Sequence, residues 1–99
     1  MQILVVPQRR KDVPVERLLP YAKAEIQAVW DLYAQGICHE FYARADQAGA
    51  AVLKVEASRI EAAKDALATL PLVHMNLIDL ELIPLAPFTH LTRLFPSES

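Results

Sequence analysis

Three side chains that can exchange protons or bind anions occupy alternate positions in the stretch HEFYARAD, which starts at His39. They are Glu40, Tyr42 and Arg44, and alternate side chains of an extended chain share one face. A carboxylate base, a phenol that donates to an enolate oxygen and a guanidinium that binds a carboxylate are the parts of a proton-transfer isomerase site. Glu40 and Tyr42 are therefore the candidate catalytic residues, and Arg44 is a candidate for substrate binding.

A second strand-like stretch, AAVLKVE, follows the turn ADQAG, so the two stretches form a hairpin. We expect Arg44 to face Ala50, which places Glu40 opposite Lys54. The alternative register sets Glu40 against Glu56, and like charges across a strand pair cost about 0.2–1 kcal/mol. Lys54 is then a further substrate-binding candidate. Alternatively, Glu40 forms an ion pair with Lys54 or Arg44 that only fills the interior of a dimer.

Two further substrate-binding candidates lie outside the hairpin. Glu25, on the first helix, could turn toward a cleft between helix and sheet, and His74, in PLVHMN, could contact a substrate near the mouth of a pocket. A loop histidine without a role explains His74 equally well. The basic loop around Arg10 could attract an anion, although a solvated loop is the commoner case. The histidines lack metal-site spacing and no glycine-rich phosphate loop is present, so we expect neither a metal nor a cofactor.

Four other segments must position these residues. A strand over residues 2–7 ends at Pro7, and a helix from Pro20 to Gln35 ends before Gly36, a left-handed cap. A second helix starts at the capping pattern formed by Ser58 and Glu61 and ends at Pro71, and a last strand runs over residues 77–83 with Pro84 as its stop. The order β-α-β-β-α-β predicts a ferredoxin-like α+β fold, with two helices on one face of a four-stranded antiparallel sheet.

Strand alternation divides the sheet into two faces. The expected helix-facing core comprises Phe41, Ala43, Leu53, Val55, Ile78, Leu80 and Leu82, met by helix stripes at Ala22, Ile26, Val29, Trp30 and Tyr33 and at Ile60, Ala63, Leu67 and Leu70. The open face comprises Cys38, Glu40, Tyr42, Arg44, Val52, Lys54, Glu56, Leu77, Asp79, Glu81 and Ile83. This face mixes charged with large apolar groups, so we expect a second subunit to cover it.

Composition limits the remaining possibilities. The 99 residues fit one domain over 1–84, followed by a tail over 85–99 whose apolar side chains pack on the domain or on a partner subunit. The net charge of −2 argues against nucleic acid as a partner, and no apolar run is long enough to span a membrane. AAVLKVE also lacks the aromatics with which RNA-binding domains stack bases. A lone cysteine and the absence of a signal-peptide pattern indicate a cytoplasmic protein.

The helix ending in YAQG, the hairpin HEFYARADQAGAAVLKVEA, the segment ALATLPL and the closing NLIDLELIPLAPF resemble the muconolactone isomerase-like proteins of the dimeric α/β-barrel superfamily. The resemblance runs from Tyr21 to Phe88. It implies that two subunits press their open sheet faces into a barrel, and that the activity is a double-bond shift in a small unsaturated lactone or acid. The alternative is a non-catalytic homo-oligomer that binds a small aromatic or hydrophobic acid.

Overall fold

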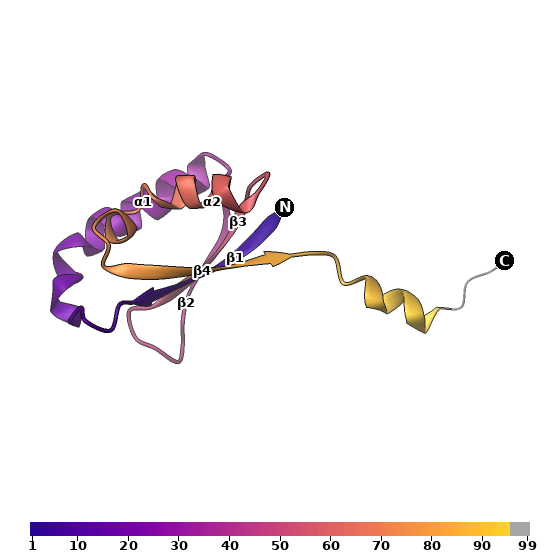
Figure 1. Ribbon diagram of the computed structural model, residues 1–99, viewed down its shortest axis with the longest axis horizontal. Coiled ribbons are helices and arrows are strands. Elements are labelled where there is room, and N and C mark those ends of the chain that lie inside the picture. The colour runs from indigo at the N-terminus through magenta and orange to yellow at the C-terminus, as the bar shows by residue number, and fades with distance from the viewer. Residues whose placement is uncertain (96–99) are drawn as a thin grey trace.

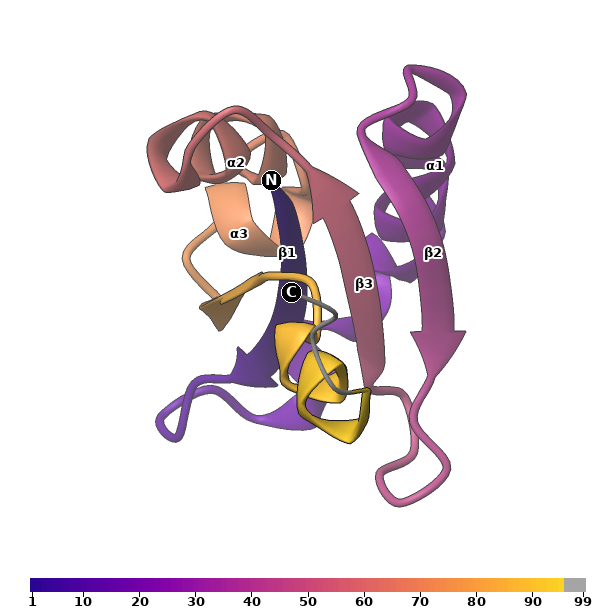
Figure 2. The same ribbon diagram turned by 90° about the vertical axis from the view of Figure 1, so that its right-hand side faces the viewer.

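The computed structural model describes residues 1–95 and has the predicted ferredoxin-like fold (Figures 1 and 2). All strand pairs are antiparallel, in the order β2-β3-β1-β4, so β2 and β4 are the edge strands. The elements are β1 (Gln2–Arg9), α1 (Ala22–Ala34), β2 (Cys38–Ala43), β3 (Ala51–Glu56), α2 (Ile60–Leu67), α3 (Pro71–His74) and β4 (Ile78–Leu85). Short 3₁₀ helices lie at Val15–Arg17, Leu19–Tyr21 and Thr89–Leu94.

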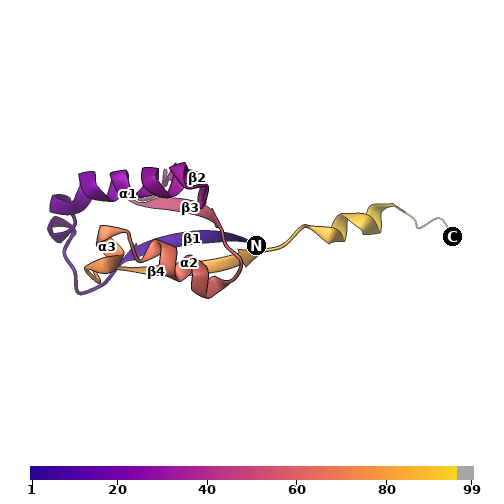
Figure 3. The same ribbon diagram turned by 90° about the horizontal axis from the view of Figure 1, so that it is seen from above.

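The hydrophobic core lies between one face of the sheet and the helices (Figures 1 and 3). Its buried members come from every layer: Ile3, Val5, Leu32, Cys38, Leu53, Val55, Ala63, Leu67 and Leu70. The predicted stripe of α2 is confirmed, because Ala63, Leu67 and Leu70 are buried and Ile60 packs against them. No helix within residues 1–95 is long and apolar enough to cross a membrane.

The first strand continues through Pro7 instead of ending there, and Pro7 pairs with Leu80 of β4. The pairing of β1 with β3 ends at Val5 and Leu53. Proline is tolerated in a strand where its imide nitrogen can face a side without a hydrogen-bonding neighbour. Beyond Val5 only β4 flanks β1, so the predicted stop is wrong for this reason.

The last strand is displaced toward the C-terminus relative to the prediction. It continues through Pro84, which the edge position of β4 permits. Leu77 precedes the strand and is buried, with its N–H donating to the carbonyl of Leu72 at 2.9 Å and its carbonyl accepting from the N–H of Arg10 at 3.2 Å. The prediction that Leu77 lies on the open face is therefore wrong.

Helix α1 ends as predicted but presents another side to the core. Gly36 has a φ of 78°, and the N–H of Ile37 donates to the carbonyl of Leu32 at 2.9 Å, which completes a Schellman cap. The core contacts come from Ala28, Val29 and Leu32. The predicted stripe is largely wrong, because its members at positions 26, 30 and 33 are exposed. Those side chains are Ile26, Trp30 and Tyr33, exposed by 70%, 55% and 45%.

The second helix differs from its prediction at both ends. Its N-cap is Arg59 in extended conformation with no side-chain capping bond, so the Ser58–Glu61 capping pattern does not form. The helix ends at Leu67, and Pro71 starts the separate short helix α3. A proline at the first position of a helix loses no hydrogen bond, because that N–H would have no helical partner.

Strand β2 contains a β-bulge that the prediction did not include. Cys38 pairs with Val55 and Glu40 pairs with Lys54, so His39 is an extra residue without a partner. The bulge places Cys38, only 1% exposed, in the core. The prediction that Cys38 shares the open face with Glu40 is wrong for this reason.

The chain projects away from the domain after β4 (Figures 1 and 3). Figure 1 shows the short 3₁₀ helix Thr89–Leu94 beyond the end of the sheet, and the longest extent is 61 Å against 28 and 20 Å. Leu85 belongs to β4, and the last four residues of the predicted tail, 96–99, lie outside the described residues. Docking of the tail on a partner subunit stays a prediction.

Candidate functional site

The open face of the sheet carries a hydrogen-bonded set of three side chains, Glu40, Tyr42 and Lys54, which we call the Glu40 cluster. The hydroxyl of Tyr42 donates to Oε1 of Glu40 at 2.6 Å, and Nζ of Lys54 forms an ion pair with Oε2. The cluster exists because Lys54 lies directly opposite Glu40 in the hairpin. The N–H of Arg44 also donates to the carbonyl of Ala50 at 2.9 Å, so the predicted register is confirmed.

The charges in the Glu40 cluster stabilise one another. The hydrogen bond from Lys54, followed by that from Tyr42, lowers the pKa of Glu40. The same carboxylate raises the pKa of Lys54 and of Tyr42. At neutral pH the cluster therefore consists of a carboxylate, an ammonium group and a neutral phenol. This set can accept a proton at one atom and donate one at another.

An apolar surface lies next to the cluster. Leu4 of β1 is the neighbour of Lys54 on one side and of Ile83 on the other, so a row from Glu40 to Ile83 crosses all four strands. Val52 pairs with Tyr42 in the adjoining row. Small-molecule sites are usually lined by apolar side chains with a few polar or charged groups. This surface would have that composition if a partner covered it.

Arg44 lies on the same hairpin but does not join the Glu40 cluster. Its Nε and Nη2 donate to the two carboxylate oxygens of Asp46 at 2.9 and 2.7 Å, a bidentate pair within the turn. The Arg44 hydrogen bonds lower the pKa of Asp46, and Asp46 raises that of Arg44. Of the two ion pairs considered for Glu40, only the one with Lys54 forms.

Glu25 and His74 lie apart from the Glu40 cluster. The carboxylate of Glu25, on α1, accepts a hydrogen bond from the N–H of Leu72 at 2.9 Å. Burial raises the pKa of Glu25, and that hydrogen bond lowers it in part. His74 is exposed at the end of α3. The sheet separates the helix layer that carries Glu25 from the open face, so one chain does not unite all six predicted residues around a single ligand.

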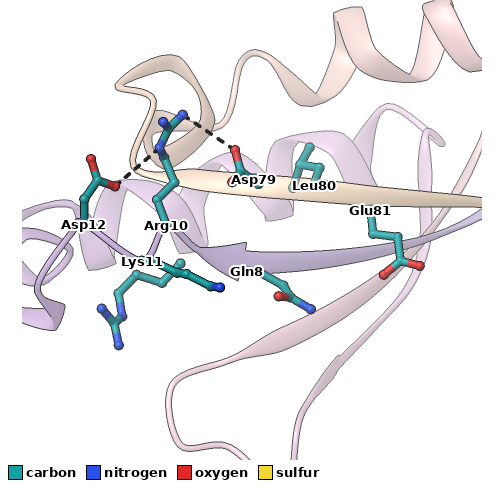
Figure 4. A pocket seen from close by; sticks show the side chains of 8 residues that line it. Gln8, Arg10, Lys11, Asp12, Asp79, Leu80 and Glu81 are labelled. Atoms are coloured by element: carbon teal, nitrogen blue, oxygen red, sulfur yellow. Dashed lines mark ion pairs between the residues drawn. The ribbon is translucent and has the colours of Figure 1, made fainter.

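A shallow groove of about 580 Å³ lies where β1 and β4 meet the basic loop (Figure 4). Arg10 borders it and forms ion pairs with Asp12 and Asp79, each at 3.7 Å, so the loop's charge is partly neutralised by its own neighbours. Glu81 and Gln8 also line the groove. Sequence reasoning missed Gln8, because it ended the first strand at Pro7 and so stopped the alternation one residue too early.

A second groove, of about 520 Å³, lies at the opposite end of the sheet, beside the N-terminus and the start of the tail. It is lined by Met1, Gln2, Glu56, Leu85, Ala86 and Pro87. The residues of the Glu40 cluster line neither groove.

Comparison with known proteins identifies structural relatives only. No protein-family model matches the chain, and no curated protein sequence matches it. A 5-chloro-2-hydroxyhydroquinone dehydrochlorinase from Burkholderia phenoliruptrix, solved with 2,5-dihydroxybenzoquinone, matches at a TM-score of 0.70 and 14% identity over 91% of this chain and 98% of the other. Muconolactone isomerase matches at 0.66 and 20% identity over 99% of this chain and 98% of the other. The chain therefore has the same ferredoxin-like fold as these two structures.

Proposed function

We propose that this protein self-associates through its open sheet face and transfers protons on a small unsaturated lactone or acid, as a muconolactone isomerase-like enzyme. The observation that carries the proposal is the Glu40 cluster, in which a carboxylate, a phenol and an ammonium group meet beside the apolar side chain of Leu4. These groups are the base and the two donors that a double-bond shift next to a carbonyl requires.

In the proposed reaction, the carboxylate of Glu40 takes a proton from the carbon next to the substrate carbonyl. The electron pair of that C–H bond forms a double bond to the carbonyl carbon, and the π pair of the carbonyl group moves to its oxygen. Lys54 and Tyr42 donate hydrogen bonds to the enolate oxygen that forms. Glu40, now a carboxylic acid, returns the proton to the far carbon of the conjugated system, which shifts the double bond. The proton is conserved and no co-reactant is consumed.

Coverage by a second subunit would improve Glu40 as a base. In the single chain, hydrogen bonds from Lys54 and Tyr42 hold the pKa of this carboxylate low. Removal of water disfavours the charged form and raises the pKa of a carboxylate, which brings it closer to the pH at which it must work. Self-association and proton transfer are therefore parts of one proposal.

The names of the two structural relatives support the substrate class. One is an isomerase of a lactone, and the other is a dehydrochlorinase of a hydroxylated ring, solved with a dihydroxybenzoquinone. Both names describe chemistry on small oxygenated rings. At 14% and 20% identity these relatives establish the fold of our chain, and the substrate class remains part of the proposal.

A second candidate is a non-catalytic homo-oligomer that binds a small aromatic or hydrophobic acid. It is favoured by the complete pairing of Glu40, whose two carboxylate oxygens are taken by Tyr42 and Lys54. Arg44 is likewise occupied by Asp46. A paired set of this kind can fill a subunit interface without any reaction.

Hydrogen–deuterium exchange separates the two candidates. The protein is incubated in D₂O with muconolactone and related unsaturated lactones, and NMR follows exchange at carbon together with product formation. We expect catalysed exchange, which the Glu40→Gln variant lowers about 100-fold or more. Glu61→Gln, an exposed carboxylate on α2, is the matched control and should leave the rate unchanged. Ligand binding without exchange would instead support the non-catalytic candidate, and equal rates for Glu40→Gln and the wild type would exclude Glu40 as the base.

A further inference from the structure

An exposed apolar surface lies on the helix side of the molecule, away from the open sheet face. It consists of Ile26, Trp30 and Tyr33 on α1 and Phe41 on β2, which we call the aromatic ridge. The ring centroids of Trp30 and Tyr33 are 5.4 Å apart, and those of Tyr33 and Phe41 are 5.6 Å apart in an edge-on arrangement. All four side chains are exposed, by 45% to 70%. A contiguous patch of large apolar groups of this kind marks a site of association.

The C-terminal segment is a second exposed apolar surface. Phe88, Leu91, Leu94 and Phe95 are exposed by 68%, 53%, 71% and 71%. All four flank or belong to a 3₁₀ helix of six residues, which is long for this type of helix, and a short helix in water has little stability of its own. This segment therefore needs a surface on which to pack.

The chain's own aromatic ridge is poorly placed to receive its tail. The tail leaves the sheet from β4, whereas the ridge lies over β2, and these are opposite edges of the sheet. Three strand spacings of about 4.8 Å put the two edges about 14 Å apart. The tail also points away from the domain, as Figure 3 shows. The radius of gyration of 16.4 Å exceeds the roughly 13 Å of a compact chain of this length.

We propose that the tail of one copy packs on the aromatic ridge of a second copy. The two surfaces are both apolar, and their charges are complementary. Arg93 is the only charged group between residues 85 and 95, and Asp31 stands beside Trp30 on α1. Asp31 is exposed, and although its carboxylate accepts a hydrogen bond from the Gln27 side chain at 3.0 Å, it is accessible to a guanidinium of a second copy.

This contact joins two different surfaces of the chain. Two copies can exchange tails reciprocally, or successive copies can close a ring. Neither arrangement uses the open sheet face. The tail contact is therefore independent of the proposed catalytic site and can coexist with pairing of the sheets.

Trp30 is the only tryptophan in the chain and reports directly on the ridge. We expect its fluorescence emission to shift to the blue as protein concentration rises, in parallel with self-association in analytical ultracentrifugation, because the tail of a second copy removes the indole from water. Leu94→Asp should abolish the concentration-dependent shift. Thr89→Asp adds the same charge on the same helix without removing an apolar side chain, and it should retain the shift.

Two results would overturn the proposal. Emission that does not depend on concentration, but shifts to the red in Leu94→Asp, would show that the tail packs on its own domain. Association without any change in Trp30 emission would show that copies meet through another surface, such as the open sheet face. A mixture of Ile26→Cys and Leu94→Cys chains adds a second readout: it should form a mixed disulfide dimer under mild oxidation, in larger yield than a mixture of Lys64→Cys and Leu94→Cys chains.

Discussion

Glu25 of α1 accepts a hydrogen bond from the backbone N–H of Leu72, and this contact joins α1 to α3 across 47 residues of sequence. Helix α3 has only four residues and starts at Pro71, which has no N–H, so the amide of Leu72 is the first donor at that end. The preceding residue, Leu70, has no side-chain oxygen to cap it. A carboxylate from another helix thus supplies the missing cap.

Removal of this cap should destabilise the protein. We expect Glu25→Ala to lower the free energy of unfolding by about 1–2 kcal/mol, because the amide of Leu72 loses its partner in a half-buried place. Glu25→Gln keeps an oxygen acceptor and should be at least as stable as the wild type at pH 7. Urea denaturation measures both variants. Equal stability of Glu25→Ala and Glu25→Gln would contradict the capping role.

The pH dependence of stability gives a separate test of Glu25. Burial raises its pKa in the folded state, so the folded protein binds more protons than the unfolded chain between the two pKa values. Stability from this group is present below the ordinary glutamate pKa of about 4.3 and is lost as pH rises through the folded value. Glu25→Gln should therefore gain on the wild type as pH rises through this window in urea denaturation. A constant difference between the two proteins would rule out a raised pKa.

Substitution of Gly36 should destabilise the protein because of the backbone conformation at this position, and not because of a steric clash. Its φ of 78° is in the left-handed region, yet an added Cβ would meet no atom within 4 Å. We expect Gly36→Ala to lower the free energy of unfolding by about 1 kcal/mol, since L-residues are strained there. Gln35→Ala, one residue earlier at a φ of −81°, is the control and should cost little. Thermal and urea denaturation that rank the two variants alike would refute the strain argument.

The register of the hairpin from Glu40 to Arg44 could be predicted from sequence. Period-two alternation fixed which side chains share a face, and the opposite charges of Glu40 and Lys54 selected the register over the one that sets Glu40 against Glu56. Gly36 also marked the end of α1 correctly, because a left-handed cap has a narrow residue preference. The helix order and the position of the Glu40 cluster followed from these local rules.

The bulge at His39 was not predicted, because the alternation from Glu40 to Arg44 was extended back to Cys38, although the apolar Cys38 does not match the polar Glu40. Tertiary contacts set it. The Schellman cap directs Ile37 into the sheet, where its carbonyl accepts the N–H of Glu56 at 2.8 Å, while the Glu40–Lys54 pair fixes the register from the other side. Between these two fixed points β2 has two residues, Cys38 and His39, whereas β3 has only Val55, so one residue of β2 is left without a partner.

The local sequence pattern also does not predict which side of α1 is exposed. The helix carries two apolar faces, and its sequence does not say which of them meets the sheet. The face that packs against the core carries the smaller residues Ala28 and Val29, together with Leu32. The larger Trp30 is left outside on the aromatic ridge.

Cys38 should be inert toward thiol reagents in the folded protein. The bulge buries it, and burial raises the pKa of its thiol and so depletes the reactive thiolate. We expect slow reaction with Ellman's reagent in buffer and fast reaction in denaturant. The added thiol of a Lys64→Cys variant, on the exposed side of α2, should by contrast release one equivalent of thionitrobenzoate at once. Rapid labelling of the wild-type protein would mean that the bulge leaves Cys38 open to solvent.

The Glu40 cluster makes a prediction that also bears on self-association. Because the hydrogen bond from Lys54 is the largest cause of the lowered pKa of Glu40, Lys54→Met should raise that pKa more than Tyr42→Phe does, as followed by NMR titration of the carboxyl carbon. In the wild type, the stability from this group is present above the ordinary glutamate pKa and is lost as pH falls through the lowered value. Lys64→Met, on α2, should leave the titration unchanged.

If a second subunit covers the open face, the pKa of Glu40 should also rise with protein concentration, because desolvation opposes its charge. A pKa independent of concentration across the range in which the protein associates would place the interface elsewhere.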